Sequence, residues 1–247
     1  MSNSSSGRRK KTAIQVAKTI IEANQIASNY GLAEYVEFEG LDIKAANDII
    51  ESLKKTKDEF PDSFNLNFVG SFEGFNKHYQ GKTYLTDVDD VSAVYATVYL
   101  NGVKHKAILL SDKHFNSKNY HSTLKNKEAM CDSSFTFYPV GCGTVKATVD
   151  HEMGHAIDDK FKISEKSQFI KNLYSKYYKP THSKKHMAIN VKMANVLSGY
   201  ANTNIEEFVA EAWSEYRNNP KPREIAKSVG NEIIKYMKEA RKESKKK

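Results

Sequence analysis

Residues 144–161 read TVKATVDHEMGHAIDDKF and have the pattern of one capped helix. Thr144 belongs to the residue types that cap helix N-termini. Val145, Val149 and Ala156 recur at helical spacing, which gives the helix an apolar side that can face a protein core. We therefore expect a helix that begins after Thr144 and ends at about Phe161.

The centre of this helix carries the motif His151-Glu152-Met153-Gly154-His155. Four residues span about 400° of helix, so both histidines project from one face about 6 Å apart. At that spacing two imidazoles can bind one zinc ion at about 2.0 to 2.1 Å. Glu152 then lies beside the metal, where a carboxylate can take a proton from the attacking water and pass it to a leaving amine.

A five-residue pattern of this kind also arises by chance where a helix displays two surface histidines. Gly154 argues against that interpretation, because a glycine inside a helix costs about 1 kcal/mol relative to alanine. The glycine predicts that another backbone comes close to this helix. This context favours a zinc site over a chance match.

A catalytic zinc site has three protein ligands and one open position. The longer metzincin form of the motif places a glycine at position 158 and a histidine at position 161, whereas this chain has Asp158 and Phe161. The metzincin class is therefore excluded. We expect the third ligand to be a carboxylate from a later helix.

Residues 204–211 read NIEEFVAE and offer such a carboxylate. Glu207 and Glu211 lie four residues apart on one face, where like charges repel unless a cation or a histidine N–H faces them. Glu207 is also the third residue after Asn204, so its alternative role is the carboxylate of a capping box. Glu206 is an alternative metal ligand.

The residues before the motif helix predict a small sheet. Segments 91–100 and 103–110 alternate apolar and polar residues around Asn101-Gly102, the dipeptide that most favours a type I′ hairpin. Residues 135–138 predict one more strand. The polar segment 111–130 predicts a long surface loop.

Helical patterns flank the sheet region on both sides. We expect N-terminal helices over 13–30 and 43–59, the second capped by Asp42. Later helices are expected over 164–177 and 183–197, after Asn204, and from about residue 222. Strands early in the chain and helices late are typical of an α+β domain.

The domain organisation follows from these patterns. We expect a disordered basic tail at 1–11, N-terminal helices packed on the domain at 12–62, the main domain at 63–235, and a basic helix end or tail at 236–247.

Composition places the chain among globular proteins. Its 247 residues are 39% hydrophobic and 28% charged, which suits one domain with a sizeable core. It has neither an apolar run long enough to span a membrane nor a secretory signal in its first thirty residues, so we expect a cytoplasmic protein as synthesised. Cys131 and Cys142 are too few for a disulfide scaffold, and we expect free thiols.

The net charge of +8 is concentrated at the two ends of the chain. Residues 8–11 are all basic, and residues 235–247 hold seven basic and two acidic side chains. The rest of the chain, with 27 basic and 28 acidic residues, is therefore close to neutral. Basic ends can bind nucleic acid, acidic lipid or an acidic partner, and they can equally be solvated chain ends.

Residues 151–159 (HEMGHAIDD) and 200–212 (YANTNIEEFVAEA) resemble the zinc peptidase domain of anthrax toxin lethal factor and the related secreted Pro-Pro endopeptidases. The resemblance covers the order, spacing and chemistry of both segments. It implies a zincin-like α+β fold of the gluzincin type, in which a small twisted sheet with a hairpin precedes the active-site helix and a mostly helical C-terminal half. Residues 137–144 also resemble zincin domains linked to phage head-morphogenesis proteins.

The same resemblance implies roles for individual residues. His151, His155 and Glu207 would bind one Zn²⁺ ion, and Tyr200 would point at the substrate oxyanion. Glu211 would orient a zinc-bound histidine, a role for which Asp158 is a further candidate. Since this chain has neither the secretion signal of the endopeptidases nor the partner-binding domains of the toxin, substrate and delivery route do not carry over.

Three functional hypotheses follow. The first is a zinc endopeptidase that cleaves a protein or peptide, with Glu152 as general base and Tyr200 as hydrogen-bond donor to the oxyanion. The second is a phage-associated or nucleic-acid-associated binding scaffold that acts through its basic tails. The third is a toxin or effector of a mobile element, which is compatible with the first and differs from it only in its target. Virion association and non-classical export both stay open as locations of the protein. We expect segment 103–110 to form the sheet edge along which an extended peptide lies antiparallel.

Overall fold

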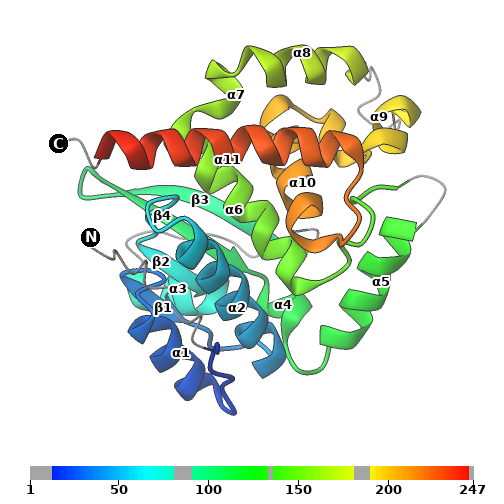
Figure 1. Ribbon diagram of the computed structural model, residues 1–247. Helices are drawn as coiled ribbons and strands as arrows, with labels where there is room; N and C mark the ends of the chain where they lie inside the picture. Colours follow the sequence, from blue (N-terminus) through cyan, green and yellow to red (C-terminus); the bar gives the residue numbers. More distant parts are fainter. Residues whose placement is uncertain (1–12, 81–90, 133–135, 181–189, 245–247) are drawn as a thin grey trace, which may run out of the picture.

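The computed structural model describes residues 13–80, 91–132, 136–180 and 190–244. The expected basic tail at 1–11 lies outside these residues. The described chain forms a mixed structure of helices and one small four-stranded sheet, compatible with the α+β class (Figure 1). The elements are α1 (Ile20–Asn29), β1 (Tyr35–Glu37), α2 (Ile43–Glu59), β2 (Phe68–Ser71), α3 (Phe72–Tyr79), β3 (Ala93–Leu100), β4 (Val103–Leu110), α4 (Asp112–Phe115), α5 (Tyr120–Asp132), α6 (Val145–Phe161), α7 (Ile163–Lys166), α8 (Gln168–Tyr177), α9 (Val191–Val196), the 3₁₀ helix η1 (Tyr200–Asn202), α10 (Ile205–Asn218) and α11 (Glu224–Ser244).

The sheet has the strand order β1-β2-β4-β3. β2 pairs in parallel with both β1 and β4, and β3 pairs antiparallel with β4. Asn101 and Gly102 both have positive φ, 51° and 79°, as a type I′ turn requires, and Leu100 pairs with Val103 across it. The predicted hairpin is confirmed, with its first strand beginning at Ala93.

The prediction that segment 103–110 forms the sheet edge is wrong. β4 lies between β2 and β3, so its backbone groups are paired on both sides, and β3 is the edge strand next to it. The hairpin pattern could not reveal this order, because it indicates only that two strands pair. The parallel partner β2 precedes the hairpin and joins β4 only in the tertiary structure.

Two faces of the sheet contribute to different cores, as the alternation of side chains along a strand requires. Val69, Ile108 and Leu110 belong to the main hydrophobic cluster, which also contains the apolar faces of α1, α2, α6 and α10. Phe68 and Leu109 point to the other face, where the aromatic side chains of α3 cover them. β1 also shows that segment 12–62 contributes a strand to the sheet as well as helices.

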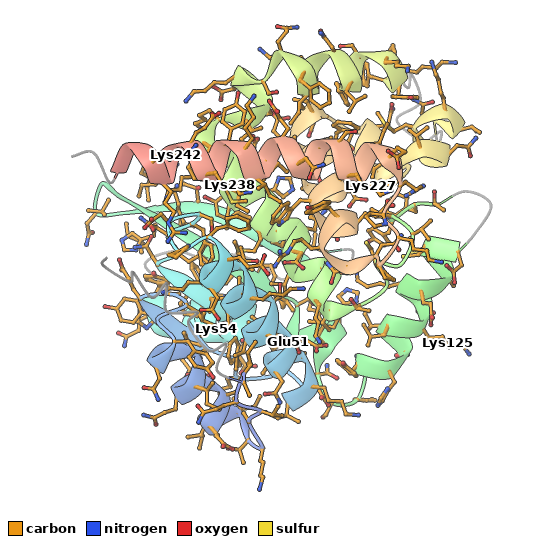
Figure 2. The ribbon with its side chains drawn as sticks, in the orientation of Figure 1. Glu51, Lys54, Lys125, Lys227, Lys238 and Lys242 are labelled. Atoms are coloured by element: carbon orange, nitrogen blue, oxygen red, sulfur yellow. The ribbon has the colours of Figure 1, made fainter. Side chains whose placement is uncertain are left out.

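The helices form layers on the main core. α6 contacts β3 and packs against α10, and α10 in turn packs against α11 (Figure 1). α11 continues past residue 235 to Ser244, and the exposed Lys227, Lys238 and Lys242 lie along it (Figure 2). None of the helices that the structure describes has the length and apolar character that a membrane crossing requires.

Helix boundaries follow local capping signals closely. Thr144 caps α6 through the amide of Ala147, Asp42 caps α2 through Lys44, and both helices end where predicted, at Phe161 and Glu59. The expected helix over 164–177 is instead divided into α7 and α8, because Ser167 caps a new helix. The expected helix over 183–197 is described only from Asn190 onward, as α9.

Segment 111–130 is not the long loop that its polarity predicts. It contains α4, capped by Ser111, and most of α5. α5 buries only Tyr120, Lys127 and Cys131, so it has no apolar stripe that a sequence pattern could reveal. Residues 136–138 form no strand; instead, the carbonyls of Thr136 and Phe137 accept hydrogen bonds from the amides of Gly199 and Tyr200.

Candidate metal centre

The site lies where α6 and α10 come close together. A Cβ atom added at Gly154 would lie 2.7 Å from the Cα atom of Ala210, closer than packed atoms allow. The predicted approach of another backbone at this glycine is therefore confirmed. It brings the first turn of α10 within reach of the histidines of α6.

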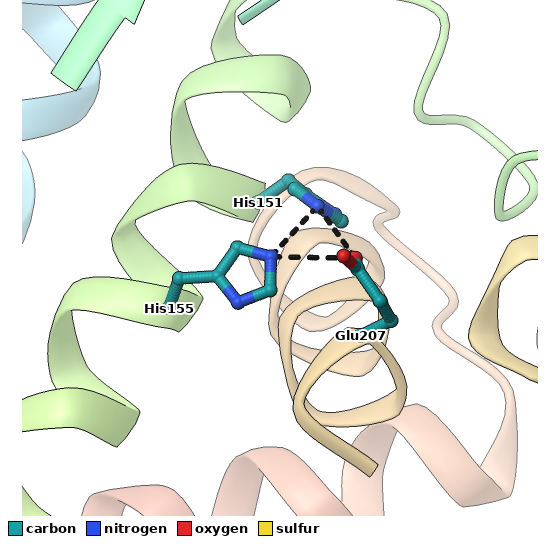
Figure 3. Close-up of side chains that lie close together, drawn as sticks. All are labelled: His151, His155 and Glu207. Atoms are coloured by element: carbon teal, nitrogen blue, oxygen red, sulfur yellow. Dashed lines mark hydrogen bonds and ion pairs between the residues drawn. The ribbon is translucent and has the colours of Figure 1, made fainter. Parts of the chain in front are cut away.

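Three side-chain atoms converge between these helices (Figure 3). The Nε2 atoms of His151 and His155 lie 3.2 Å apart, and they lie 3.2 and 3.3 Å from Oε2 of Glu207. These residues form a group that can hold a metal ion. The expected ligand set is thus brought together by two helices that are far apart in the sequence.

The spacing of these atoms fits a tetrahedral metal site. Two ligand atoms at about 2.0 to 2.1 Å from a tetrahedral centre are about 3.3 Å apart. Glu207 Oε2 is buried, and although the two histidine nitrogens lie close to it, it accepts no hydrogen bond of good geometry from the described residues. Two imidazoles and one carboxylate are also the donor types that zinc accepts. The residues present therefore fit a zinc ion.

Glu211 fixes the orientation of His151. Its Oε1 lies 2.8 Å from Nδ1 of His151, and its Oε2 accepts a 2.7 Å hydrogen bond from the hydroxyl of Ser198. Because a carboxylate accepts, the Nδ1 proton of His151 is directed to Glu211, which leaves the Nε2 lone pair of the neutral imidazole facing the ligand cluster. Glu211 thus contacts the ring nitrogen of His151 that faces away from the candidate ligand atoms.

The electrostatics of the cluster favour a bound cation. Burial alone would lower the pKa of His151, but Glu207 and Glu211 outweigh it and raise that pKa well above its ordinary value. Burial alone would raise the pKa of Glu207, but the two imidazoles lower it to about 2. A metal ion and a proton would therefore compete for this cluster.

The sequence left two alternatives open for the carboxylates of α10: Glu207 as a capping-box residue and Glu206 as the metal ligand. The positions of the two side chains decide both. Asn204 caps α10 by accepting a 2.7 Å hydrogen bond from the amide of Glu207, while the Glu207 side chain points at the histidines. The capping-box role is therefore not the one that the Glu207 carboxylate has here. Glu206 is exposed on the outer side of the same turn and is absent from the converging group.

Glu152 lies beside the ligand cluster and is buried. Its Oε2 accepts a 2.6 Å hydrogen bond from the backbone amide of Tyr95 in β3. Since that amide bonds to Glu152 and not to β4, it points to the free edge of the sheet. Glu152 is thus held between the candidate metal centre and the edge strand.

Tyr200 also lies at the cluster, as expected. Its hydroxyl is 3.4 Å from Oε1 of Glu207, and its ring lies 6.0 Å from that of His151. Burial is the largest cause of a raised pKa for Tyr200, followed by the charge of Glu207. The phenol therefore stays protonated at neutral pH and remains a hydrogen-bond donor.

The structure does not place Asp158 with the other site residues. Both of its carboxylate oxygens accept 2.7 Å hydrogen bonds from Ser164, one from the amide and one from the hydroxyl. Asp158 therefore stabilises the turn from α6 into α7. The role considered for it, orienting a zinc-bound histidine, is corrected.

A cavity of about 250 Å³ opens next to the cluster. His151, Glu152, Tyr200 and Glu211 line one part of it, and side chains from α5, the start of β3 and the residues before α6 line the rest. Sequence patterns missed several of these neighbours. Lys127 in the cavity wall carries no local signal, and neither do Ser198 and Tyr95, which lie outside the wall and bond to Glu211 and Glu152.

Comparisons of the chain with protein-family models, with curated proteins and with solved structures give no match.

Proposed function

We propose that this protein is a zinc-dependent endopeptidase with a zincin-like fold of the gluzincin type, similar to the lethal factor and Pro-Pro endopeptidase domains. The observation that carries the proposal is the near-equilateral triangle of His151 Nε2, His155 Nε2 and Glu207 Oε2, with sides of 3.2 to 3.3 Å. A buried carboxylate and a protonated tyrosine flank this triangle. A structural zinc site would need neither of these extra groups.

A zinc ion bound there would supply a Lewis acid that polarises the peptide carbonyl and makes a water molecule more acidic. Glu152 would take the proton of that water and pass it to the leaving amine, since its carboxylate lies between the ligand cluster and the sheet edge. The hydroxyl of Tyr200 would donate a hydrogen bond to the developing oxyanion. Glu211 and Ser198 would hold His151 in its ligating orientation.

The edge strand that would hold an extended peptide is β3, in place of the segment predicted from the sequence. Its outer edge faces Glu152 through the amide of Tyr95. A peptide that adds to this edge would run past the carboxylate and the ligand cluster. Main-chain pairing at a sheet edge is a common way in which proteins bind extended peptides.

Cleavage profiling of a peptide library by mass spectrometry tests the proposal. Zinc-loaded wild type should produce cuts that disappear with a chelator and with Glu152→Gln, whereas Glu206→Gln should cut as wild type does. Absence of cuts from folded protein that holds one zinc per chain would contradict the peptidase function. The alternative of a non-catalytic scaffold would then be favoured.

A further inference from the structure

Lys127 is a buried lysine that the proposed mechanism does not use. It lies on α5, and only 7% of its surface is exposed, whereas Lys125, two residues earlier on the same helix, is exposed and points outward (Figure 2). Lysine is among the residue types least often buried without a partner. Its burial therefore calls for a specific reason.

The ammonium group of Lys127 has no hydrogen bond or ion pair among the described residues. Its Nζ atom lies over the ring of Tyr138, 4.4 Å from the ring centroid. Burial lowers the pKa of Lys127, although the charges of Glu211 and Glu152 oppose that effect. A buried ammonium without a paired anion destabilises the folded protein, so an anion from outside the chain would relieve this cost.

Lys127 lines the cavity that adjoins the candidate metal centre. Lys127, Tyr138 and Cys142 line that cavity together with His151 and Glu152. Its volume of about 250 Å³ is below the range of about 300 to 1,000 Å³ typical of pockets for whole small ligands. The cavity is thus of the size expected for one side chain or one chain end of a larger substrate.

The position of the cavity relative to the edge strand indicates which part of a peptide would enter it. Residues 91–93, at the start of β3, line the cavity, and Tyr95 lies further along the strand beside Glu152. In a peptide that pairs antiparallel with β3, the part that follows the cleaved bond would lie over the start of the strand. The cavity therefore faces the C-terminal side of the cleavage point.

We propose that this cavity is a specificity pocket in which Lys127 binds a carboxylate of the peptide substrate on the C-terminal side of the cleaved bond. The carboxylate would come from an Asp or Glu side chain or from the free C-terminus of a short peptide. The apolar part of the wall, which includes Phe137, Tyr138 and Pro139, would exclude water from this ion pair and strengthen it. The inference rests on the proposed peptidase function and adds a substrate class to it.

Cleavage profiling with two peptide libraries tests this pocket, one with free and one with amidated C-termini. Wild type should prefer cuts followed by an acidic residue, or by a free C-terminus, by about tenfold or more. Lys127→Met should lose that preference, and the matched variant Lys125→Met should keep it. If the preference persists with amidated peptides, the carboxylate that Lys127 binds comes from an Asp or Glu side chain. If it is confined to peptides with free C-termini, that carboxylate is the terminal one.

Two results would contradict the proposal that this cavity is a specificity pocket. One is cleavage by wild type without any acidic preference. The other is an equal loss of cleavage of all peptides in Lys127→Met, which would make Lys127 a counter-charge for Glu152 and Glu211. Circular dichroism checks folding, and Lys127→Gln replaces Lys127→Met if the latter does not fold.

A binding experiment separates failure of this pocket from failure of the proposed function. The same libraries are passed over immobilised Glu152→Gln protein and over the double variant Glu152→Gln/Lys127→Met. Retention of acidic peptides only on the former supports the pocket, even where wild type cuts nothing. Equal retention on both overturns the pocket, even where wild type cuts peptides.

Discussion

The carboxylate of Glu152 is hydrogen-bonded to the backbone amide of Tyr95, with Oε2 and N 2.6 Å apart. This bond joins the motif helix α6 to the edge strand β3. It positions the proposed general base without using another side chain, so the carboxylate is oriented by the fold itself. The same bond brings the edge strand next to the helix that carries His151 and His155.

Glu152→Gln should abolish or strongly reduce activity while keeping the fold. The amide oxygen of glutamine can still accept the bond from Tyr95, but it cannot take a proton, and loss of such a group costs about 10² to 10⁴-fold in rate. Peptide turnover and thermal melting should be measured on the same zinc-loaded preparation. Unchanged turnover would remove Glu152 from the mechanism.

Glu207→Gln should lower metal affinity far more than Glu206→Gln, its neighbour on the exposed side of the same turn. A neutral amide is a much poorer zinc ligand than a carboxylate, whereas Glu206 does not face the cluster. Zinc affinity can be measured by competition with a chromogenic chelator. Equal affinities in the two variants would show that Glu207 is not a ligand.

Glu211→Gln should weaken zinc binding by about 10 to 100-fold, which is the usual effect of losing a group that orients a metal-bound histidine. The carboxylate now accepts from Nδ1 of His151 and from Ser198. Glutamine keeps only one acceptor oxygen and no charge. The chelator competition assay measures the loss, and an affinity equal to wild type would contradict the orienting role.

Gly154→Ala should destabilise the protein by a net of up to about 2 kcal/mol, since overpacking usually costs about 1 to 3 kcal/mol. The added methyl group would lie 2.7 Å from Cα of Ala210, a backbone atom that can move only with α10. The helix propensity of alanine offsets about 1 kcal/mol of this cost. Urea unfolding of the two proteins measures the difference, and greater stability of the variant would contradict the close packing.

Asp159 should contribute stability that disappears in acid. Burial alone would raise its pKa, but bonds from Lys106, Tyr95 and Lys162 outweigh it and lower the pKa of Asp159 below its ordinary value. A carboxylate with a lowered folded pKa stabilises the protein above its unfolded pKa of about 3.9, and this contribution falls as pH drops toward the folded pKa.

Urea midpoints of wild type and Asp159→Asn at several pH values test this contribution. The wild type should be the more stable at pH 7, and the gap should narrow progressively below about pH 4. A gap that is independent of pH would mean that the interactions of Asp159 do not depend on its charge.

Local patterns in the sequence were enough to predict several elements. The spacing of His151 and His155 puts both on one helix face whatever surrounds it, because helical geometry repeats within one element. Likewise, Asn101-Gly102 favours a type I′ turn through its own backbone preferences, and Thr144 caps α6 through its own hydroxyl.

Only the tertiary structure decided which distant groups meet. The choice of Glu207 over Glu206 depends on the direction from which α10 approaches α6, which the contact of Gly154 with Ala210 sets. The choice of β3 over β4 as edge strand depends on the parallel pairing with β2.

Asp158 and Lys127 also show that the sequence alone does not determine which distant residues come into contact. Asp158 lies one turn from the candidate ligand His155, yet Ser164 on the next helix donates hydrogen bonds to both of its carboxylate oxygens. Lys127 lies in a segment with the polarity of a loop, yet the packing of α5 buries it at the cavity beside the cluster. The sequence by itself determined the residues that one helix or turn presents. Their partners were decided by long-range packing, because residues far apart in the chain have no fixed spacing until the elements assemble.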